Sequence, residues 1–186
     1  MNELTYDNVQ VTGRAYENRL VISDNFKTRG LKINFAGTNA SVEIGINANI
    51  QGTLTLNNNA HIFIDENFSN TNSLTIISRE NCNVTIGKDC MFATAVLIRT
   101  SDEHSIIDLT TNETININKD VLIGDHVWLC DNALILKGSN IGNGSIVGAR
   151  SVVTGKYPPN VLLVGSPVKV VKKNVSWEKK HPKKTI

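Results

Sequence analysis

Apolar residues recur every six positions along most of this chain, and this period restricts the fold more than any other feature of the sequence. We call these recurring positions slots. In a first block the slots run from Ile44 to Ile98, and all but Glu80 are apolar. In a second block, one step out of phase, they run from Ile117 to Val153, and all are apolar. Only 40% of the chain is apolar, so chance does not explain the pattern. A period of six does not match a helical period of about 3.6, and it predicts short strands wound into a coil.

Residues between the slots suit the corners of such a coil. Four places after each slot of the second block comes a small or β-branched residue that fits a narrow interior: Val127, Ala133, Ser139, Ser145 and Ser151. Glycines directly follow three slots, where a tight corner leaves little room for a side chain: Gly124, Gly142 and Gly148. Asn and Asp, which tolerate left-handed backbone, take further corner positions: Asn47, Asn57, Asp89 and Asp125. We therefore expect an all-β parallel solenoid with three hexads in each triangular coil.

The chain of 186 residues is expected to hold one domain over residues 1–170. Residues 1–40 lack the period and are expected to form a cap or an irregular first coil. Residues 171–186, rich in lysine and containing Trp177, are expected to form a tail that packs on an assembly or frays.

Charge and composition exclude several classes of partner and compartment. The chain has 19 basic and 17 acidic residues, a balance of +2, which is too close to neutral for a nucleic-acid or membrane-surface protein. No stretch approaches the roughly 18 apolar residues of a membrane-spanning helix, and no leader peptide is recognisable at the start. The three cysteines, Cys82, Cys90 and Cys130, do not form a close pair, which indicates reduced thiols and a cytoplasmic location.

The phase shift between the blocks comes from residues 99–116, which we expect to form a loop that protrudes from the shaft and builds a site. The loop contains His104, flanked by Asp102, Glu103 and Asp108. A histidine can act as a general base near neutral pH, which a weakly acidic hydroxyl needs before it attacks a thioester. The alternative for His104 is an ordinary solvated loop histidine.

Four segments carry a resemblance to a known family. They are CMFA from Cys90, SDEHSIID from Ser101, IGDHVWL from Ile123, and IGNGSIVGARSVVT from Ile141. Together they resemble the hexapeptide-repeat acyltransferases, and most closely the O-acetyltransferases of capsular and other surface polysaccharides, including those of polysialic acid. The resemblance covers about residues 40–170 and implies a left-handed parallel β-helix.

The same resemblance implies an enzyme that transfers an acetyl group from acetyl-CoA to a sugar hydroxyl. By that comparison His104 is the general base, and Trp128 positions the acetyl group or donates a hydrogen bond to the developing oxyanion. Asp102 is expected to orient the imidazole, in preference to Asp108. The resemblance also implies a homotrimer that binds acetyl-CoA and a carbohydrate acceptor between subunits.

The donor site is likewise transferred from the family. Gly148, Ala149 and Ser151 are expected along the pantetheine groove, where small residues let the ligand approach the backbone. Lys169 is expected near the CoA phosphates, assisted by Arg150 or Lys156. Cys130 stands where the family commonly has glycine and is expected beside the thioester channel. The alternative for the lysines is a solvated basic tail.

Four other functions compete with this interpretation. An acetyltransferase of a small acceptor, such as a free sugar, a nucleotide amino sugar or an antibiotic, would use the same chemistry. A γ-type carbonic anhydrase needs three histidines that bind one zinc ion. The histidines of this chain are scattered along the sequence, so no metal is expected. They are His61, His104, His126 and His181. A non-enzymatic solenoid would not explain the loop, and a serine acetyltransferase would need a long helical N-terminal region.

Overall fold

The computed structural model describes residues 7–13 and 16–180, and every helix or strand assigned in these ranges is a β-strand. In chain order the strands are β1 (Val9–Gly13), β2 (Arg19–Ile22), β3 (Lys27–Phe35), β4 (Ser41–Ile44), β5 (Asn49–Leu56), β6 (His61–Ile64), β7 (Ser69–Asn72), β8 (Leu74–Ser78), β9 (Asn83–Ile86), β10 (Met91–Thr94), β11 (Leu97–Arg99), β12 (Val121–Ile123), β13 (Trp128–Leu129), β14 (Leu134–Ile135), β15 (Asn140–Ile141), β16 (Ile146–Val147), β17 (Val152–Val153), β18 (Lys156–Tyr157), β19 (Val161–Gly165) and β20 (Val168–Lys173).

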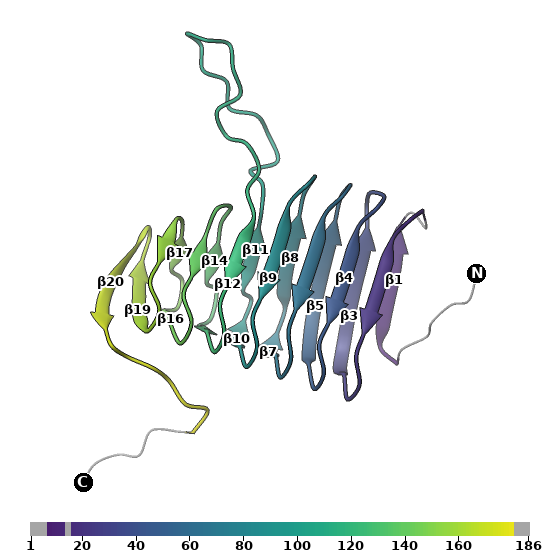
Figure 1. The fold of residues 1–186 in the computed structure, drawn as a ribbon, viewed down its shortest axis with the longest axis vertical. Coiled ribbons are helices and arrows are strands. Elements are labelled where there is room, and N and C mark those ends of the chain that lie inside the picture. Colours follow the sequence, from purple (N-terminus) through teal and green to yellow (C-terminus); the bar gives the residue numbers. More distant parts are fainter. Residues whose placement is uncertain (1–6, 14–15, 181–186) are drawn as a thin grey trace.

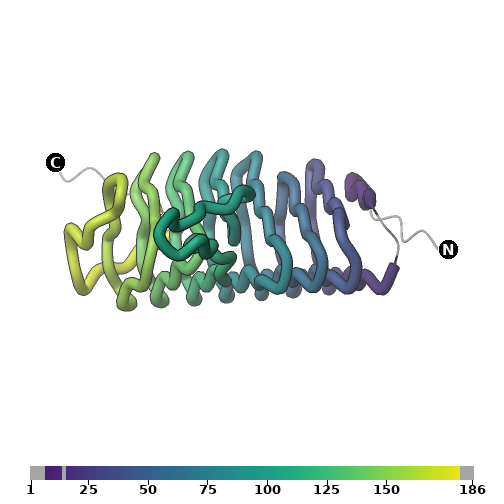
Figure 2. Tube along the Cα trace, turned by 90° about the horizontal axis from the view of Figure 1, so that it is seen from above, coloured from purple at the N-terminus to yellow at the C-terminus, as the bar shows by residue number. Residues whose placement is uncertain are grey.

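These strands stack in three columns that form the faces of a shaft. One face carries β8, β11, β14 and β17, the next carries β9, β12, β15 and β18, and the third carries β10, β13, β16 and β19. Successive coils lie side by side from β1 to β20 (Figure 1), and the view from above shows the same regular stack (Figure 2). All pairings between named strands are parallel except that of β19 with β20. The expected all-β parallel β-helix is therefore confirmed.

The core is a set of apolar columns inside the shaft. In one column Ile76, Ile98, Ile135 and Val153 pair in register from coil to coil, and each is 0% exposed. Because neighbouring side chains of a strand point to opposite faces, every second residue enters this interior. Burying each such side chain contributes about 1.5–3 kcal/mol, so the columns supply the main stabilisation of the fold.

The six-residue period proves regular only in the second half of the shaft. Hydrogen bonds between neighbouring coils join residues 18 apart there, but 20 or 22 apart in the first half. Glu80 interrupts the first block because it lies in the corner between β8 and β9, where it is exposed. Ile117, taken as the first slot of the second block, is 63% exposed in the loop, so its assignment to the core is wrong.

Asparagine ladders hold the corners together in the first half of the shaft. Asn39, Asn59 and Asn81 each adopt left-handed backbone, with φ of 52°, 52° and 57°. Their side chains are joined by hydrogen bonds of 2.8 and 3.0 Å. A second ladder has the same form and contains Asn25, Asn47, Asn67 and Asp89. Asparagine suits both tasks, since it tolerates this conformation and its amide both donates and accepts.

Two of the four predicted corner residues do not have the left-handed conformation. Asn47 and Asp89 have it, whereas the left-handed residue comes at Asn59 rather than Asn57, and at His126 rather than Asp125. Asp125 instead accepts a hydrogen bond of 3.1 Å from the Lys88 N–H through its carboxylate. The Asp125 carboxylate therefore links two coils, a role that the amino-acid composition of the corner does not indicate.

The small residues of the second block fill the corners as predicted, since all five are buried. The glycine prediction also has a steric basis at Gly124. A Cβ atom there would lie 2.1 Å from Oδ1 of Asn143 and 2.9 Å from its backbone nitrogen. The close approach of two coils at this corner therefore requires glycine.

Strands near both ends of the described residues take part in the stack. β1 pairs with β3 and β3 with β5, so strands are present within residues 1–40, where a cap or irregular coil was expected. At the other end β20 folds back antiparallel on β19 and extends to Lys173. His181 and the rest of the 171–186 tail beyond residue 180 lie outside the described residues. Within the described ranges, no helix has the length and apolarity to cross a bilayer.

Candidate active site

Between β11 and β12 the chain leaves the shaft in one long excursion, residues 100–120 (Figure 1). Hydrogen bonds on either side of it join residues 37 apart instead of 18 to 22, which locates the insertion. Its two arms are linked by the antiparallel bridge of Ile107 with Thr114. At the tip, the Asp108 carboxylate accepts a hydrogen bond of 2.7 Å from the Thr110 N–H, and this bond lowers the pKa of Asp108. The excursion is thus a structured arm.

The base of this arm is fixed by Lys137, which lies one coil further along. Lys137 Nζ lies 2.5 Å from Oδ2 of Asp102 and donates a hydrogen bond of 2.6 Å to the carbonyl of Asn116. The Asn116 amide in turn donates to Asp102 Oδ2, at 2.9 Å, and to the carbonyl of His104, at 2.8 Å. Lys137 first and Asn116 second lower the pKa of Asp102. These contacts fix the backbone at His104, whose side chain is exposed.

A second cluster fixes the residue before His104. Glu103 has left-handed backbone, with φ of 69°, and its carboxylate lies between two guanidinium groups. The N···O distances are 2.6 Å to Arg79 and 3.1 Å to Arg99. The hydrogen bond from Arg79 is the main cause of the lowered pKa of Glu103. His104 is therefore presented from an anchored stretch of backbone.

The structure gives Asp102 partners other than those expected for a carboxylate that orients an imidazole. Its Oδ2 atom is shared by Lys137 and Asn116, and Asp108 bonds to the turn at the tip of the arm. Neither Lys137 nor Asn116 was among the site residues expected from the sequence. Each stands on its own in the sequence, and only the length of the arm brings them to Asp102.

Trp128 lies on β13, half-buried, in a different setting. A segment that follows β20, residues 174–180, folds back beside it, and the rings of Trp128 and Trp177 are 6.0 Å apart between centroids. Trp177 also stacks on His126, with a centroid distance of 4.4 Å and an interplanar angle of 6°. Trp177 is buried against its own chain, so the tail does not fray at this residue, and packing of the tail on other subunits stays a prediction.

Within one chain His104 and Trp128 lie at different corners of the shaft. The arm that carries His104 leaves the shaft between β11 and β12 (Figure 1), whereas Trp128 begins β13, after the next corner. Strand β12 and the corner that follows it therefore separate the two residues along the chain.

Most residues expected to hold the donor gather at the corner after β13 and the corner after β16. Cys130 donates its N–H to the carbonyl of Val147, next to Gly148, and Arg150 donates its N–H to the carbonyl of Asp131. Ala149 and Arg150 are exposed. Burial raises the pKa of the Cys130 thiol to about 11, so Cys130 is a neutral thiol near pH 7.

The other three residues expected there are arranged differently. Ser151 is buried, and its hydroxyl accepts a hydrogen bond of 3.1 Å from the Gly165 N–H, so its side chain supports the coil. Lys169 is exposed on β20, where it pairs with Val164 close to Gly148. Lys156 begins β18 and pairs with Asn140, on another face of the shaft.

Backbone N–H groups at the donor corner suit an amide-containing ligand. In a preceding coil the Thr94 N–H is bonded to the Asp131 carboxylate, at 3.1 Å. Among the described residues, no acceptor is found for the equivalent N–H groups of Asp131 and Ala149. These two groups can donate hydrogen bonds to the carbonyls of a ligand lying along the corner.

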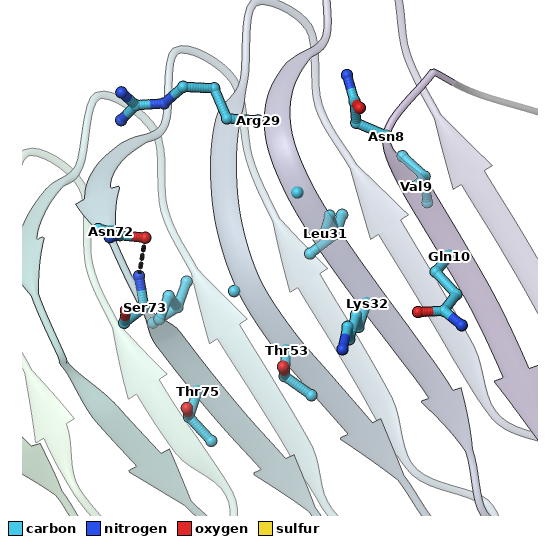
Figure 3. Close-up of a pocket in the computed structure, with 13 residues that line it drawn as sticks. Asn8, Val9, Gln10, Arg29, Leu31, Lys32, Thr53, Asn72, Ser73 and Thr75 are labelled. Atoms are coloured by element: carbon cyan, nitrogen blue, oxygen red, sulfur yellow. Dashed lines mark hydrogen bonds between the residues drawn. The ribbon is translucent and has the colours of Figure 1, made fainter.

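A hollow of about 550 Å³ lies far from these residues, at the N-terminal end of the shaft (Figure 3). Strands β1, β3 and β5 line it, and its charged residues are Arg29 and Lys32. Gly52 is also one of the residues that line it. A Cβ atom at Gly52 would lie 1.9 Å from the carbonyl oxygen of Leu74. No expected site residue borders it, so it is separate from the candidate active site.

The described residues contain no cluster of three or more His, Cys, Asp and Glu side chains that could hold a metal ion.

A sequence-family model, described as bacterial transferase hexapeptide (six repeats), matches residues 120–155. This segment contains Trp128 and most of the donor corner.

Several known proteins are similar to the chain. It is 37% identical to a polysialic acid O-acetyltransferase of Neisseria meningitidis over 90% of this chain and 88% of the relative. It is 35% identical to a polysialic acid O-acetyltransferase of Escherichia coli O1:K1 / APEC, covering 73% of this chain but only 44% of that relative. The crystal structure of the polysialic acid O-acetyltransferase OatWY matches 96% of this chain and 94% of its own, with a TM-score of 0.84 and 31% identity.

Proposed function

This chain belongs to the hexapeptide-repeat acetyltransferases with a left-handed β-helix, the family of the polysialic acid O-acetyltransferases, and on that premise we propose that it transfers an acetyl group from acetyl-CoA to a hydroxyl of a sugar in a surface polysaccharide. The observation that carries this proposal is the anchored arm with His104 exposed on it. A carrier or structural solenoid has no use for an insertion fixed by two separate charged clusters.

In the proposed reaction His104 is the general base. Its imidazole takes the proton of the acceptor hydroxyl while the hydroxyl oxygen attacks the carbonyl carbon of the thioester. The tetrahedral oxyanion then collapses, the C–S bond breaks, and the imidazolium returns the proton to the sulfur, which leaves CoA thiol and an O-acetyl sugar. In this scheme Trp128 either donates a hydrogen bond from its indole N–H to the oxyanion or holds the acetyl group against its ring.

Asp102 has an indirect part in this scheme. Its carboxylate accepts from Asn116, which also holds the carbonyl of His104. We propose that Asp102 sets the direction of the arm, and that any contact with the imidazole forms only in the complete site.

The donor fits the corner that carries Cys130, Gly148 and Ala149. The N–H groups of Asp131 and Ala149 are available to the amide carbonyls of a pantetheine arm, and Lys169 and Arg150 supply positive charge for the phosphates. Ser151 acts through its place in the coil. Lys156, on another face, would reach the same donor only from a neighbouring subunit.

We further propose a homotrimer with sites between subunits. The arm exposes apolar side chains that a neighbour would cover, and Leu109 is 96% exposed. The others are Ile106, Ile107, Ile115 and Ile117. A neighbouring subunit would also bring Trp128 to His104. A cytoplasmic location is proposed with it, because the described cysteines are free and acetyl-CoA is a cytoplasmic donor.

Release of CoA thiol from acetyl-CoA tests the proposal, with capsular and lipopolysaccharide sugars, including polysialic acid, as acceptors. We expect turnover with an acidic or neutral polysaccharide, and a loss of at least roughly 10²-fold in His104→Ala, since a general base contributes about that much. His61→Ala is the matched control, because His61 is an exposed histidine on β6, away from the arm. The assignment would be refuted if neither the wild type nor His104→Ala turned over any acceptor, or if the two had equal activity.

A further inference from the structure

We propose that Trp177 forms the end wall of the acyl pocket and limits the donor to a short acyl group such as acetyl. This inference rests on the proposed function, because that function places the acetyl group beside Trp128. It adds a specificity-determining residue and the element that holds it, residues 174–180, which we call the strap.

The strap begins directly after the last strand and is fixed at a corner of the shaft. Asn174 follows β20, and its left-handed backbone, with φ of 57°, turns the chain. Val175 donates its N–H to the carbonyl of Asn160, at 3.1 Å, and the Asn160 amide donates to the carbonyl of Val175, at 3.4 Å. The strap is therefore attached to the corner before β19.

A second attachment lies at the corner before β13. Trp177 Nε1–H donates to the carbonyl of His126, at 2.8 Å, and His126 Nε2 lies 3.1 Å from the carbonyl of Trp177. A carbonyl can only accept, so Nε2 carries a proton in this contact. Because the two rings also stack and Trp177 is 7% exposed, the indole is held in one position.

Between these attachments the strap lies over an outward-facing row of side chains. The row pairs in register from β13 through β16 to β19 and consists of Trp128, Ile146 and Leu162. The residue after each of them is 0% exposed inside the shaft, so the alternation of a strand turns the row outward. Ile146 is nevertheless only 8% exposed, which means that another part of the chain covers the row. The strap contacts the same row, since the rings of Trp177 and Trp128 are 6.0 Å apart between centroids.

Trp177 and the donor corner lie on opposite sides of Trp128. The order along the chain is His126, on which Trp177 stacks, then Trp128, then Cys130 at the donor corner. A strand rises about 3.3 Å per residue, so at most about 13 Å separate His126 from Cys130. In the proposed complex the acyl chain extends from the donor corner to Trp128, and its far end points toward Trp177. A longer acyl chain therefore meets an indole that two hydrogen bonds and a ring stack hold in place.

The test compares kcat/KM for acetyl-CoA, propionyl-CoA and butyryl-CoA, with the sugar that gives the highest rate in the CoA-release assay. One methylene group that does not fit a pocket lowers kcat/KM by about 10- to 200-fold, so we expect the wild type to prefer acetyl-CoA over propionyl-CoA to that extent. Trp177→Ala should reduce this preference by about 10-fold, because the wall is removed. Trp177→Phe keeps a smaller ring and should reduce it less.

Val175→Ala is the matched control. It shortens a side chain of the same strap, whereas both hydrogen bonds with Asn160 involve the backbone of Val175 and remain possible. The control should keep the preference of the wild type for acetyl-CoA. Thermal unfolding of all three variants checks that the shaft is still folded.

The inference would be overturned by a wild type that uses acetyl-CoA and propionyl-CoA equally well, or by an unchanged preference in Trp177→Ala. It would also be overturned if Val175→Ala lost the preference to the same extent, since the effect would then belong to the strap as a whole. A rise in the acceptor KM of Trp177→Ala, with the donor preference unchanged, would assign Trp177 to the acceptor instead. All of these results leave the proposed function intact, whereas a wild type that releases CoA from none of the three donors would remove the function itself.

Discussion

At the scale of single residues, the position of His104 depends on side chains other than its own. Asn116 holds its carbonyl, Lys137 holds both Asn116 and Asp102, and Glu103 beside it is held between two arginines. Bonds of this kind limit the positions that the imidazole can reach. A general base gains from such restriction, since a small misplacement lowers the rate of attack.

Lys137→Ala should therefore lower kcat without preventing folding. We expect a fall of about 10-fold in kcat and little change in the KM for acetyl-CoA, because the arm loses its attachment while the donor corner is unaltered. Lys137→Arg, which keeps the charge and can still donate, should recover much of the loss. Steady-state kinetics and thermal unfolding of both variants provide the measurement.

The matched control for this prediction is Lys88→Ala, which removes an exposed lysine from another corner. A kcat for Lys137→Ala equal to that of the control would show that the ion pair with Asp102 does not position the base. A large fall in thermal stability would instead assign Lys137 to the fold.

At the scale of elements, the strands of one face determine the length of each coil. On this face β8 has five residues in a coil of 22, whereas β14 and β17 have two residues each in coils of 18. The hexad pattern predicted the shorter coils well, because one small residue per corner repeats at a fixed spacing. It failed for the longer coils because they gain an even number of residues, which keeps the inward alternation of the strands, so the apolar pattern stays nearly in phase and Glu80 remained an unexplained exception.

The left-handed asparagines are testable at Asn59. Asn59→Gly removes two exposed hydrogen bonds, but glycine adopts the left-handed backbone conformation without strain. Asn59→Ala removes the same bonds and also leaves a Cβ atom on a residue with φ of 52°. We expect the alanine variant to be less stable than the glycine variant by about 1 kcal/mol in free energy of unfolding. Urea denaturation of both proteins measures the difference, and equal stabilities would mean that the side-chain ladder alone matters at this corner.

At the scale of the whole molecule, the sequence predicted the fold, the arm and the family, but not which residues meet. The shaft follows from a local repeat that is readable in one dimension. The contacts at the site join distant residues, such as Trp177 with His126 at a separation of 51, and depend on how far the arm and the tail extend. The proposed pairing of His104 with Trp128 goes one step further, because β12 and a corner separate them within one chain and we propose that they meet across a subunit boundary.

Mixed oligomers test this central claim most directly. His104→Ala and Trp128→Ala chains, each inactive alone, are co-expressed in equal amounts with different tags, purified through both tags, and assayed for release of CoA thiol. If each site takes its histidine from one chain and its tryptophan from the next, every trimer that carries both tags has one complete site out of three, and activity should recover to about a third of the wild-type value. Activity no higher than that of the parent variants would contradict the account, because it would mean that both residues of a site come from the same chain or that one of them takes no part.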